Sequence, residues 1–136
     1  MTHLPRLLLL GLLAMSTVIL SAATSVTFTD ITEQAGLRFA HNNGAFGAKY
    51  MPETFGSGAV WLDVDNDGWQ DLLFVNGTSW PESATPSTTA ALYRNDGDGT
   101  FTDITVGSGL DIPIYGMGGT AADFDNDGHV DLYVTA

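Results

Sequence analysis

The segment Gly56–Gly77 reads GSGAVWLDVDNDGWQDLLFVNG, with an apolar run on either side of an aspartate-rich centre. It recurs at Gly116–Ala136 as GMGGTAADFDNDGHVDLYVTA, which begins 60 residues later (116 − 56). A second block, FTDIT, occurs at Phe28–Thr32 and again at Phe101–Thr105. Two unrelated blocks that recur in the same order indicate a structural repeat.

The repeat is expected to consist of short strands. Its apolar runs are rich in β-branched and large apolar residues, and the Ser/Thr/Pro-rich segment Gly77–Thr89 is typical of an exposed loop. The Asp-Gly pairs within Asn95–Gly99 favour a tight hairpin turn. Four antiparallel strands in about 60 residues are typical of one β-propeller blade, so we expect an all-β fold. The strands expected in the first repeat are Ala59–Leu62, Leu72–Val75, Ala91–Arg94 and Thr100–Ile104.

Each aspartate-rich centre is a nine-residue loop whose carboxylates can bind a cation. Side chains at loop positions 1, 3, 5 and 9 converge when the chain curls, together with the backbone carbonyl of position 7, and a glycine at position 6 permits the closing turn. All-oxygen ligands suit a hard cation, and calcium tolerates this many carboxylates better than magnesium does. The predicted Ca²⁺ ligands are Asp63, Asp65, Asp67, Asp71 and the backbone of Trp69 in the first loop, and Asp123, Asp125, Asp127, Asp131 and the backbone of His129 in the second.

The clustering of negative charge also argues for a bound ion. Two carboxylates about 5 Å apart repel by roughly 3 kcal/mol at an effective dielectric constant of about 20. An EF-hand would need a glutamate at position 12 and flanking helices, whereas position 12 is Phe74 in the first loop and Val134 in the second. A metal-free Asp/Asn/Gly turn is the remaining alternative, and the presence of two copies in register counts against it.

The composition narrows the function classes. The chain of 136 residues has no cysteine, which excludes a disulfide framework, a cysteine-based zinc site and thiol catalysis. Its formal net charge of −12 argues against nucleic acid and anionic membrane surfaces as partners. Eight of its 16 acidic residues lie in the two aspartate loops, so the charge is concentrated where a cation would bind.

Residues 1–23 are predicted to be a cleavable signal peptide. Arg6 supplies a positive start, Leu7–Leu20 is largely apolar, and Ser21 and Ala23 suit cleavage after Ala23. An apolar run of about 14 residues is shorter than the roughly 20 needed to span a bilayer, which disfavours a membrane anchor. We therefore expect a secreted, periplasmic or otherwise extracellular chain without stable membrane insertion.

Several other polar residues have roles that the sequence leaves open. Asp96 and Asp98 could contribute to another cation site, although the chemistry of a tight turn also accounts for them. His41 and Glu53 lie in a long insert before the first aspartate loop, where a functional site is possible. Asn76 begins an Asn-Gly-Thr sequon, which is relevant only in a host that glycosylates.

The blocks GSGAVWLDVDNDGWQDLLFVNG and LYRNDGDGTFTDIT resemble the FG-GAP (VCBS) repeats of integrin α-chain propellers. The resemblance is closer to secreted proteins of the cartilage acidic protein and ASPIC/UnbV group. In that group FTDIT, an AGL-like turn, a Phe-x-His segment and a Pro-Glu pair recur. Here these are Phe28–Thr32, Ala35–Leu37, Phe39–His41 and the pair Pro52 and Glu53.

This resemblance extends over roughly Val26 to Ala136 and implies a seven-bladed β-propeller that binds calcium in its blade hairpins through the aspartates named above. Residues 24–136, the repeat region, supply fewer than two complete blades, whereas propellers close with about four to eight. We therefore expect an N-terminal fragment of a propeller, truncated at its C-terminus. In a closed ring the first FTDIT strand, Phe28–Thr32, would join the last blade.

The resemblance further implies use in adhesion or other extracellular binding. The sequence is thus interpreted as a non-enzymatic, calcium-dependent module whose partner is an extracellular protein or polysaccharide. The alternative is a fragment of a propeller-based extracellular enzyme in which calcium helps to bind an anionic substrate. Such an enzyme needs a convergent set of His, Lys or Arg near the metal. Only Arg38, Lys49 and Arg94 remain as basic residues after cleavage, and they form no obvious set.

Export with cleavage near Ala23 is a testable prediction of this reading. Expression of the whole chain in a host with a secretory pathway should yield a mature chain that begins near Thr24, because Arg6 and the apolar run direct export. Intact-mass measurement and N-terminal sequencing of the exported protein test it. Soluble cytoplasmic protein that keeps Met1 would contradict the prediction.

Overall fold

The structure, a computed structural model, describes residues 25–136, so the predicted signal peptide lies outside the described residues. The chain divides into two units, Met1–Asp30 and Ile31–Ala136. The described part of the first unit, residues 25–30, has no regular secondary structure. Within residues 25–136, no helix has both the length and the apolar character needed to cross a membrane.

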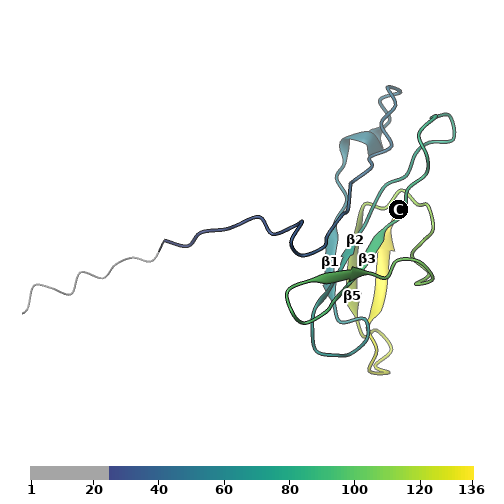
Figure 1. Ribbon diagram of the computed structural model, residues 1–136. Coiled ribbons are helices and arrows are strands. Elements are labelled where there is room, and N and C mark those ends of the chain that lie inside the picture. Colours follow the sequence, from purple (N-terminus) through teal and green to yellow (C-terminus); the bar gives the residue numbers. More distant parts are fainter. Residues whose placement is uncertain (1–24) are drawn as a thin grey trace, which may run out of the picture. The chain divides into compact units, whose positions relative to one another are not determined.

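The second unit contains a four-stranded antiparallel sheet whose strands follow one another in chain order (Figure 1). The aspartate-rich loop connects the first two strands, with Leu62 opposite Asp71. The all-β fold is confirmed, and each strand end lies within one residue of its predicted position. The strands are β1 Ala59–Leu62, β2 Asp71–Phe74, β3 Ala91–Asn95 and β4 Phe101–Asp103, and a short 3-10 helix, η1 Met51–Thr54, precedes them.

A separate hairpin repeats the first half of this sheet. Strand β5, Gly118–Ala122, pairs with β6, Asp131–Thr135, and Ala122 lies opposite Asp131. This register is the same as that of Leu62 with Asp71 in the first sheet, shifted by 60 residues (122 − 62 and 131 − 71). The repeat seen in the sequence is therefore a repeat of backbone structure.

The hydrophobic core lies between the first sheet and this hairpin. Because side chains alternate between the faces of a strand, each strand contributes every second residue to the core. Burial of one Leu or Val side chain contributes about 1.5–3 kcal/mol, so this contact holds the two repeats together. The buried residues are Val60, Leu62, Leu73, Val75, Ala90 and Leu92, and the second hairpin packs Ala121, Val130, Leu132 and Val134 against them.

Glycines allow the two repeats to approach closely. A Cβ atom built at Gly58 would lie 3.3 Å from the Cα atom of Gly118. At Gly116 a Cβ atom would overlap Val75 Cγ1 and lie 2.8 Å from the carbonyl oxygen of Asn76. Gly116 donates its own N–H to that oxygen at 3.0 Å. The glycine-rich start of each repeat is therefore a point of contact between repeats.

The opposite face of the first sheet is covered by the chain that precedes it. The ring of Phe39 stacks on that of Phe74 with centroids 4.6 Å apart, and Phe74 meets Tyr93 edge-on at 5.9 Å. Ala35 is buried, and its carbonyl accepts the N–H of Phe101 at 2.9 Å. Both faces of the first sheet thus have partners.

The structure has no strand at Phe28–Thr32, where one was expected. The carbonyls of Ile31 and Thr32 accept hydrogen bonds from the N–H groups of Ala35 at 2.8 Å and Leu37 at 3.0 Å. These local bonds form a turn in place of a strand, and they confirm the turn predicted at Ala35–Leu37. The later FTDIT block does begin with a strand, β4, because it pairs with β3.

One face of the second hairpin is open. By the repeat, Tyr133 corresponds to the core residue Leu73, but Tyr133 is 68% exposed whereas Leu73 is fully buried. Phe124, the counterpart of Val64, is 91% exposed. The second hairpin therefore packs one face against the first repeat and leaves apolar residues of its other face exposed to solvent.

We expect the mature chain to self-associate through this open face and the free edge of β6, even at saturating calcium. Sedimentation velocity over a range of concentrations measures this association. Tyr133→Lys should weaken it, whereas Thr85→Lys, the same charge placed in the exposed loop before β3, should not. A compact monomer with a sharp, cooperative thermal transition would contradict the prediction.

Candidate metal sites

The first aspartate loop, residues 63–71, is folded by hydrogen bonds from its own backbone. The two carboxylate oxygens of Asp63 accept the N–H groups of Asp67 at 3.0 Å and Gly68 at 2.9 Å. Gly68 has a φ of +90° and Asn66 a φ of +59°, so the loop needs two left-handed residues. The role of Gly68 is as predicted, and glycine and asparagine are the residues that adopt this conformation most readily.

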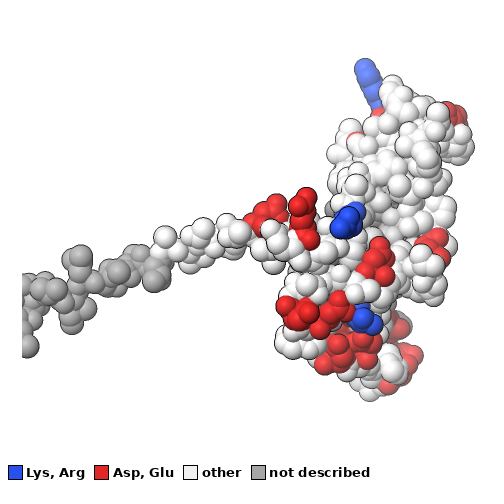
Figure 2. Space-filling model, in the orientation of Figure 1, with Lys and Arg blue, Asp and Glu red and all other residues white. Residues whose placement is uncertain are grey.

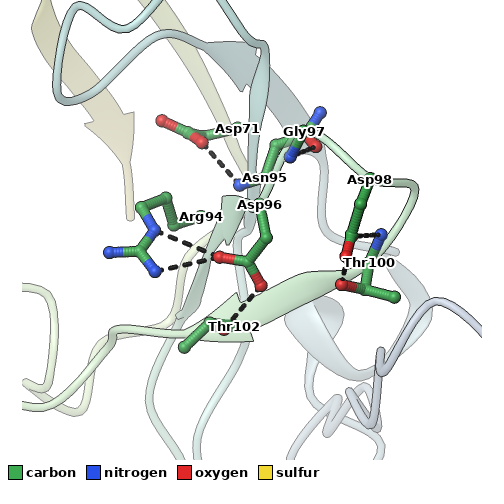
Figure 3. Close-up of polar contacts among 8 residues, drawn as sticks. All are labelled: Asp71, Arg94, Asn95, Asp96, Gly97, Asp98, Thr100 and Thr102. Carbon is green, nitrogen blue, oxygen red and sulfur yellow. Dashed lines mark hydrogen bonds and ion pairs between the residues drawn. The ribbon is translucent and has the colours of Figure 1, made fainter.

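Asp71 ties this loop to the sheet. Its side chain is fully buried, yet both of its oxygens accept backbone hydrogen bonds, one from Val64 at 2.8 Å and one from Asn95 at 2.7 Å. Figure 3 shows the second of these bonds, between the start of β2 and the end of β3. Asp71 thus fixes the position of the loop before any ion binds.

Three carboxylates converge in this loop. Asp63, Asp65 and Asp71 each offer one oxygen, and these three oxygens lie within 4.8 Å of one another. Asp65 is exposed, Asp63 is half-buried and Asp71 is buried, so the group opens to solvent on one side. This spacing lets a single cation contact all three residues at once.

Asp67 has a different role from its three neighbours. Its Oδ1 atom accepts the N–H of Trp69 at 2.8 Å, in the manner of an Asx turn, and it is not part of the converging group. Asp127 does the same with the N–H of His129 at 2.8 Å. Ligation by these two aspartates and by the carbonyls of Trp69 and His129 stays a prediction.

The second aspartate loop, residues 123–131, repeats the geometry of the first in a more exposed setting. Asp123 accepts the N–H groups of Asp127 at 3.1 Å and Gly128 at 3.0 Å, and Asp131 accepts that of Phe124 at 2.8 Å. Asp123, Asp125 and Asp131 bring three oxygens within 4.8 Å of one another, and all three residues are exposed. Asp131 differs from Asp71 because no strand of the described chain corresponds to β3 beside it.

The donor set of both loops fits a hard divalent cation. Each carboxylate oxygen has two lone pairs, so a bond to a backbone N–H still leaves one for a metal. Every member is an oxygen donor, which suits calcium or magnesium better than zinc or copper. Both loops lie at the same end of the second unit, where Figures 1 and 2 show the hairpin loops and a concentration of acidic side chains.

The two loops also touch each other, which the sequence did not reveal. Asn66 Nδ2 lies 3.2 Å from the carbonyl oxygen of Gly128 and 3.1 Å from Nδ1 of His129. The imidazole of His129 therefore contacts the first loop, whereas the sequence had assigned a role only to its backbone. The only sequence signal was the asparagine at loop position 4, which a left-handed turn already explains.

The tight turn between β3 and β4 is explained by its own side chains. Asp96 forms an ion pair with Arg94 at 2.9 Å and accepts a hydrogen bond from Thr102 at 2.7 Å (Figure 3). The bonds from Thr102 and Arg94 lower the pKa of Asp96, and bonds from Thr100 lower the pKa of Asp98. Turn chemistry therefore accounts for both aspartates, and neither belongs to a converging carboxylate group in the described chain.

Trp69 packs against this turn. A Cβ atom at Gly97, where φ is +76°, would lie 2.9 Å from Nε1 of the Trp69 indole. The turn needs glycine there for its backbone conformation and for the space that the indole occupies. The side chain of Trp69 thus links the first aspartate loop to the β3–β4 turn, while its backbone carbonyl remains a candidate ligand.

The long insert before the first loop is held by a buried polar network around Asn76. Asn76 is 3% exposed, its Oδ1 accepts the N–H of Asn42 at 2.8 Å, and its Nδ2 donates to the carbonyl of Thr89 at 3.0 Å. His41 Nδ1 lies 3.2 Å from the same Oδ1 and 2.9 Å from Ser57 Oγ. The network anchors the insert to the end of β2, so His41 has a structural role.

Burial and hydrogen bonds also bear on the sequon at Asn76 and on Glu53, whose roles the sequence left open. The amide nitrogen of Asn76 is buried and already bonded, so the folded chain has no room for a glycan there. Glu53 accepts a hydrogen bond from Asn43 Nδ2 through its backbone carbonyl, at 2.7 Å. Neither His41 nor Glu53 joins the converging carboxylates.

Comparison with known protein families places the aspartate loops within a matched segment. The family described as FG-GAP-like repeat matches residues 63–134, which is 72 of the 136 residues (134 − 63 + 1). The match begins at the first aspartate of the first loop and ends in β6, so it includes both loops. No curated protein and no solved structure matched the chain.

The equivalent residues Asp71 and Asp131 allow a test of how much their hydrogen bonds to the backbone stabilise the fold. Asp71→Asn should lower the free energy of unfolding by about 2–4 kcal/mol, because an amide NH₂ would face a backbone donor in a buried site. Asp131→Asn, at the exposed position with one such bond, should cost less than about 1 kcal/mol. Urea unfolding in the presence of a chelator measures both without metal. Equal effects of the two substitutions would contradict this account.

Proposed function

The chain belongs to the FG-GAP-like repeat family, and from this premise we propose that it is a calcium-binding β-propeller module for extracellular binding or adhesion. The observation that carries the proposal is the pair of converging carboxylate groups at equivalent positions of two successive repeats. A single aspartate turn is common without a metal. Two such groups in register, inside the segment matched by this family, favour a repeated cation site.

Calcium is the ion that the donor set supports best. Calcium accepts six to eight oxygen ligands at about 2.3–2.6 Å in flexible geometry, whereas magnesium requires a near-ideal octahedron. Three carboxylates from one nine-residue loop, with Asp67 or Asp127 and the position-7 carbonyl as further predicted ligands, suit the more tolerant ion. When bound, calcium would neutralise the repulsion within each group and stiffen the loop.

An extracellular location and a binding role rest on the family and on the sequence. FG-GAP-like repeat proteins are typically extracellular or surface-associated, and residues 1–23 have the pattern of a signal peptide. Calcium is abundant outside cells, where weak sites can be filled. An extracellular protein or polysaccharide is the proposed partner, because a net charge of −12 repels nucleic acid.

A non-enzymatic role is supported by the ion pairing of Arg94. Arg94, whose charge is influenced by Asp65 and Asp67 of the first aspartate loop, is engaged by Asp96 in an ion pair. Arg38 and Lys49 lie in the insert before β1. The ion pair leaves Arg94 less available to bind an anionic substrate beside the metal, which favours a binding role over an enzymatic one.

Isothermal titration of the chelator-treated mature chain should show about two bound Ca²⁺ ions. Asp65→Asn should abolish one site or weaken it roughly tenfold or more, because the number of charged ligands sets calcium affinity. Asp125→Asn should do the same to the other site. Glu82→Gln, which removes the charge of an exposed acid in the loop before β3, should leave both unchanged. The absence of heat at millimolar calcium would refute the calcium proposal.

A further inference from the structure

We infer that Asn66 is a positioning residue for the second aspartate loop and that it couples the two calcium sites, an inference that rests on the proposed function. Asn66 occupies position 4 of the first loop, between Asp65 and Asp67. Its contacts nevertheless lie 62 and 63 residues further along the chain, in the second loop.

The contact is made by the side-chain NH₂ group of Asn66. One N–H of Nδ2 is donated to the carbonyl oxygen of Gly128 at 3.2 Å. Nδ2 also lies 3.1 Å from Nδ1 of His129, which accepts a hydrogen bond in the tautomer that carries its proton on Nε2. The amide therefore holds two successive residues of the second loop from outside that loop.

These two residues are the ones whose placement matters for the second site. Gly128 has a φ of +89° and donates its N–H to Asp123, so it sets the curl of the loop. His129 follows and carries the position-7 carbonyl predicted to bind the ion. Holding this backbone in place before the ion arrives reduces the ordering that binding would otherwise require, which increases affinity.

The same contact transmits the state of the first site. An ion held by Asp63, Asp65 and Asp71 restrains the backbone on both sides of Asn66, and with it the donor amide. A restrained amide orders residues 128–129 at a lower entropic cost than a mobile one. Coupling of this kind is reciprocal, so an ion in either loop should raise the affinity of the other.

The second loop provides a matched control. Asn126 is the counterpart of Asn66, has the same left-handed conformation with a φ of +62°, and makes no hydrogen bond between loops in residues 25–136. A left-handed turn alone would favour asparagine at both positions. Among the described residues, the amide at loop position 4 binds a neighbouring repeat in the first loop and not in the second.

The test follows each loop separately in the exported, full mature chain, with Ca²⁺ alone as the probe. The backbone amides of Gly68 and Gly128 donate to the first aspartate of their own loops, at 2.9 Å and 3.0 Å, so their NMR signals report the two loops individually. Asn66→Gly and Asn126→Gly each place at position 4 a residue that adopts positive φ readily. Only Asn66→Gly also removes the contact between the loops. Calorimetry on the same samples gives the number of ions bound.

Asn66→Gly should raise the calcium midpoint at Gly128 by about three- to tenfold, the effect expected for one lost net hydrogen bond. Because the coupling is reciprocal, the midpoint at Gly68 should rise by no more than the same factor. Asn126→Gly should shift neither midpoint by more than about twofold. Asp65→Asn, which disables the first loop, should also raise the Gly128 midpoint. The double variant Asp65→Asn and Asn66→Gly should raise the Gly128 midpoint little further than either single substitution does, because both remove the same coupling.

Two results would overturn the inference in distinguishable ways. If wild-type Gly128 titrates normally and neither Asn66→Gly nor Asp65→Asn moves its midpoint, the loops are independent and the calcium proposal stands alone. If neither glycine amide responds to calcium in the wild type, the calcium proposal fails and the coupling fails with it.

Discussion

A carboxylate can be buried only where hydrogen-bond donors replace the water that it loses, and Asp71 meets this condition with two backbone N–H groups. One donor comes from the loop, at Val64, and the other from β3, at Asn95. The start of β2 is therefore fixed to two other segments at a single point. This also restrains the positions of the other two converging carboxylates, because Asp63 and Asp65 lie in the loop between Leu62 of β1 and Asp71 at the start of β2.

The second loop lacks half of this support. Asp131 keeps the bond from Phe124, the counterpart of Val64, but no strand in the described chain donates to its other oxygen. Its carboxylates are correspondingly more exposed. The contact from Asn66 supplies part of the missing restraint from the neighbouring repeat. The close approach of the repeats makes this contact possible, and it depends on glycine at positions such as 58 and 116.

The sequence predicted what depends on local pattern and missed what depends on neighbouring segments. Apolar runs, Asp-Gly turns and the exact 60-residue offset were enough to locate the strands of the first sheet and the aspartates that converge. The strand expected at Phe28–Thr32 is absent because a strand needs hydrogen bonds from a neighbour, and the sequence block alone does not supply one. The carboxylates of Asp67 and Asp127 looked equivalent to the others by spacing. In the fold each accepts the backbone N–H of the residue two positions later in the chain. Residue spacing alone does not show whether such a carboxylate stabilises the turn or binds an ion.

The chain has no cysteine, so no disulfide stabilises its fold. In the described residues the main cluster of the core has six buried members, and the second hairpin packs four partly buried residues against it. An ion that binds only the folded state stabilises it by about 2.7 kcal/mol when its concentration is a hundredfold above the dissociation constant. Two sites would contribute about 5 kcal/mol, which is comparable to the whole stability of a small domain. In the proposed calcium-bound state, the loops therefore act as the cross-links of this fold, at the place where Asp71 and Asn66 already join one segment to the next.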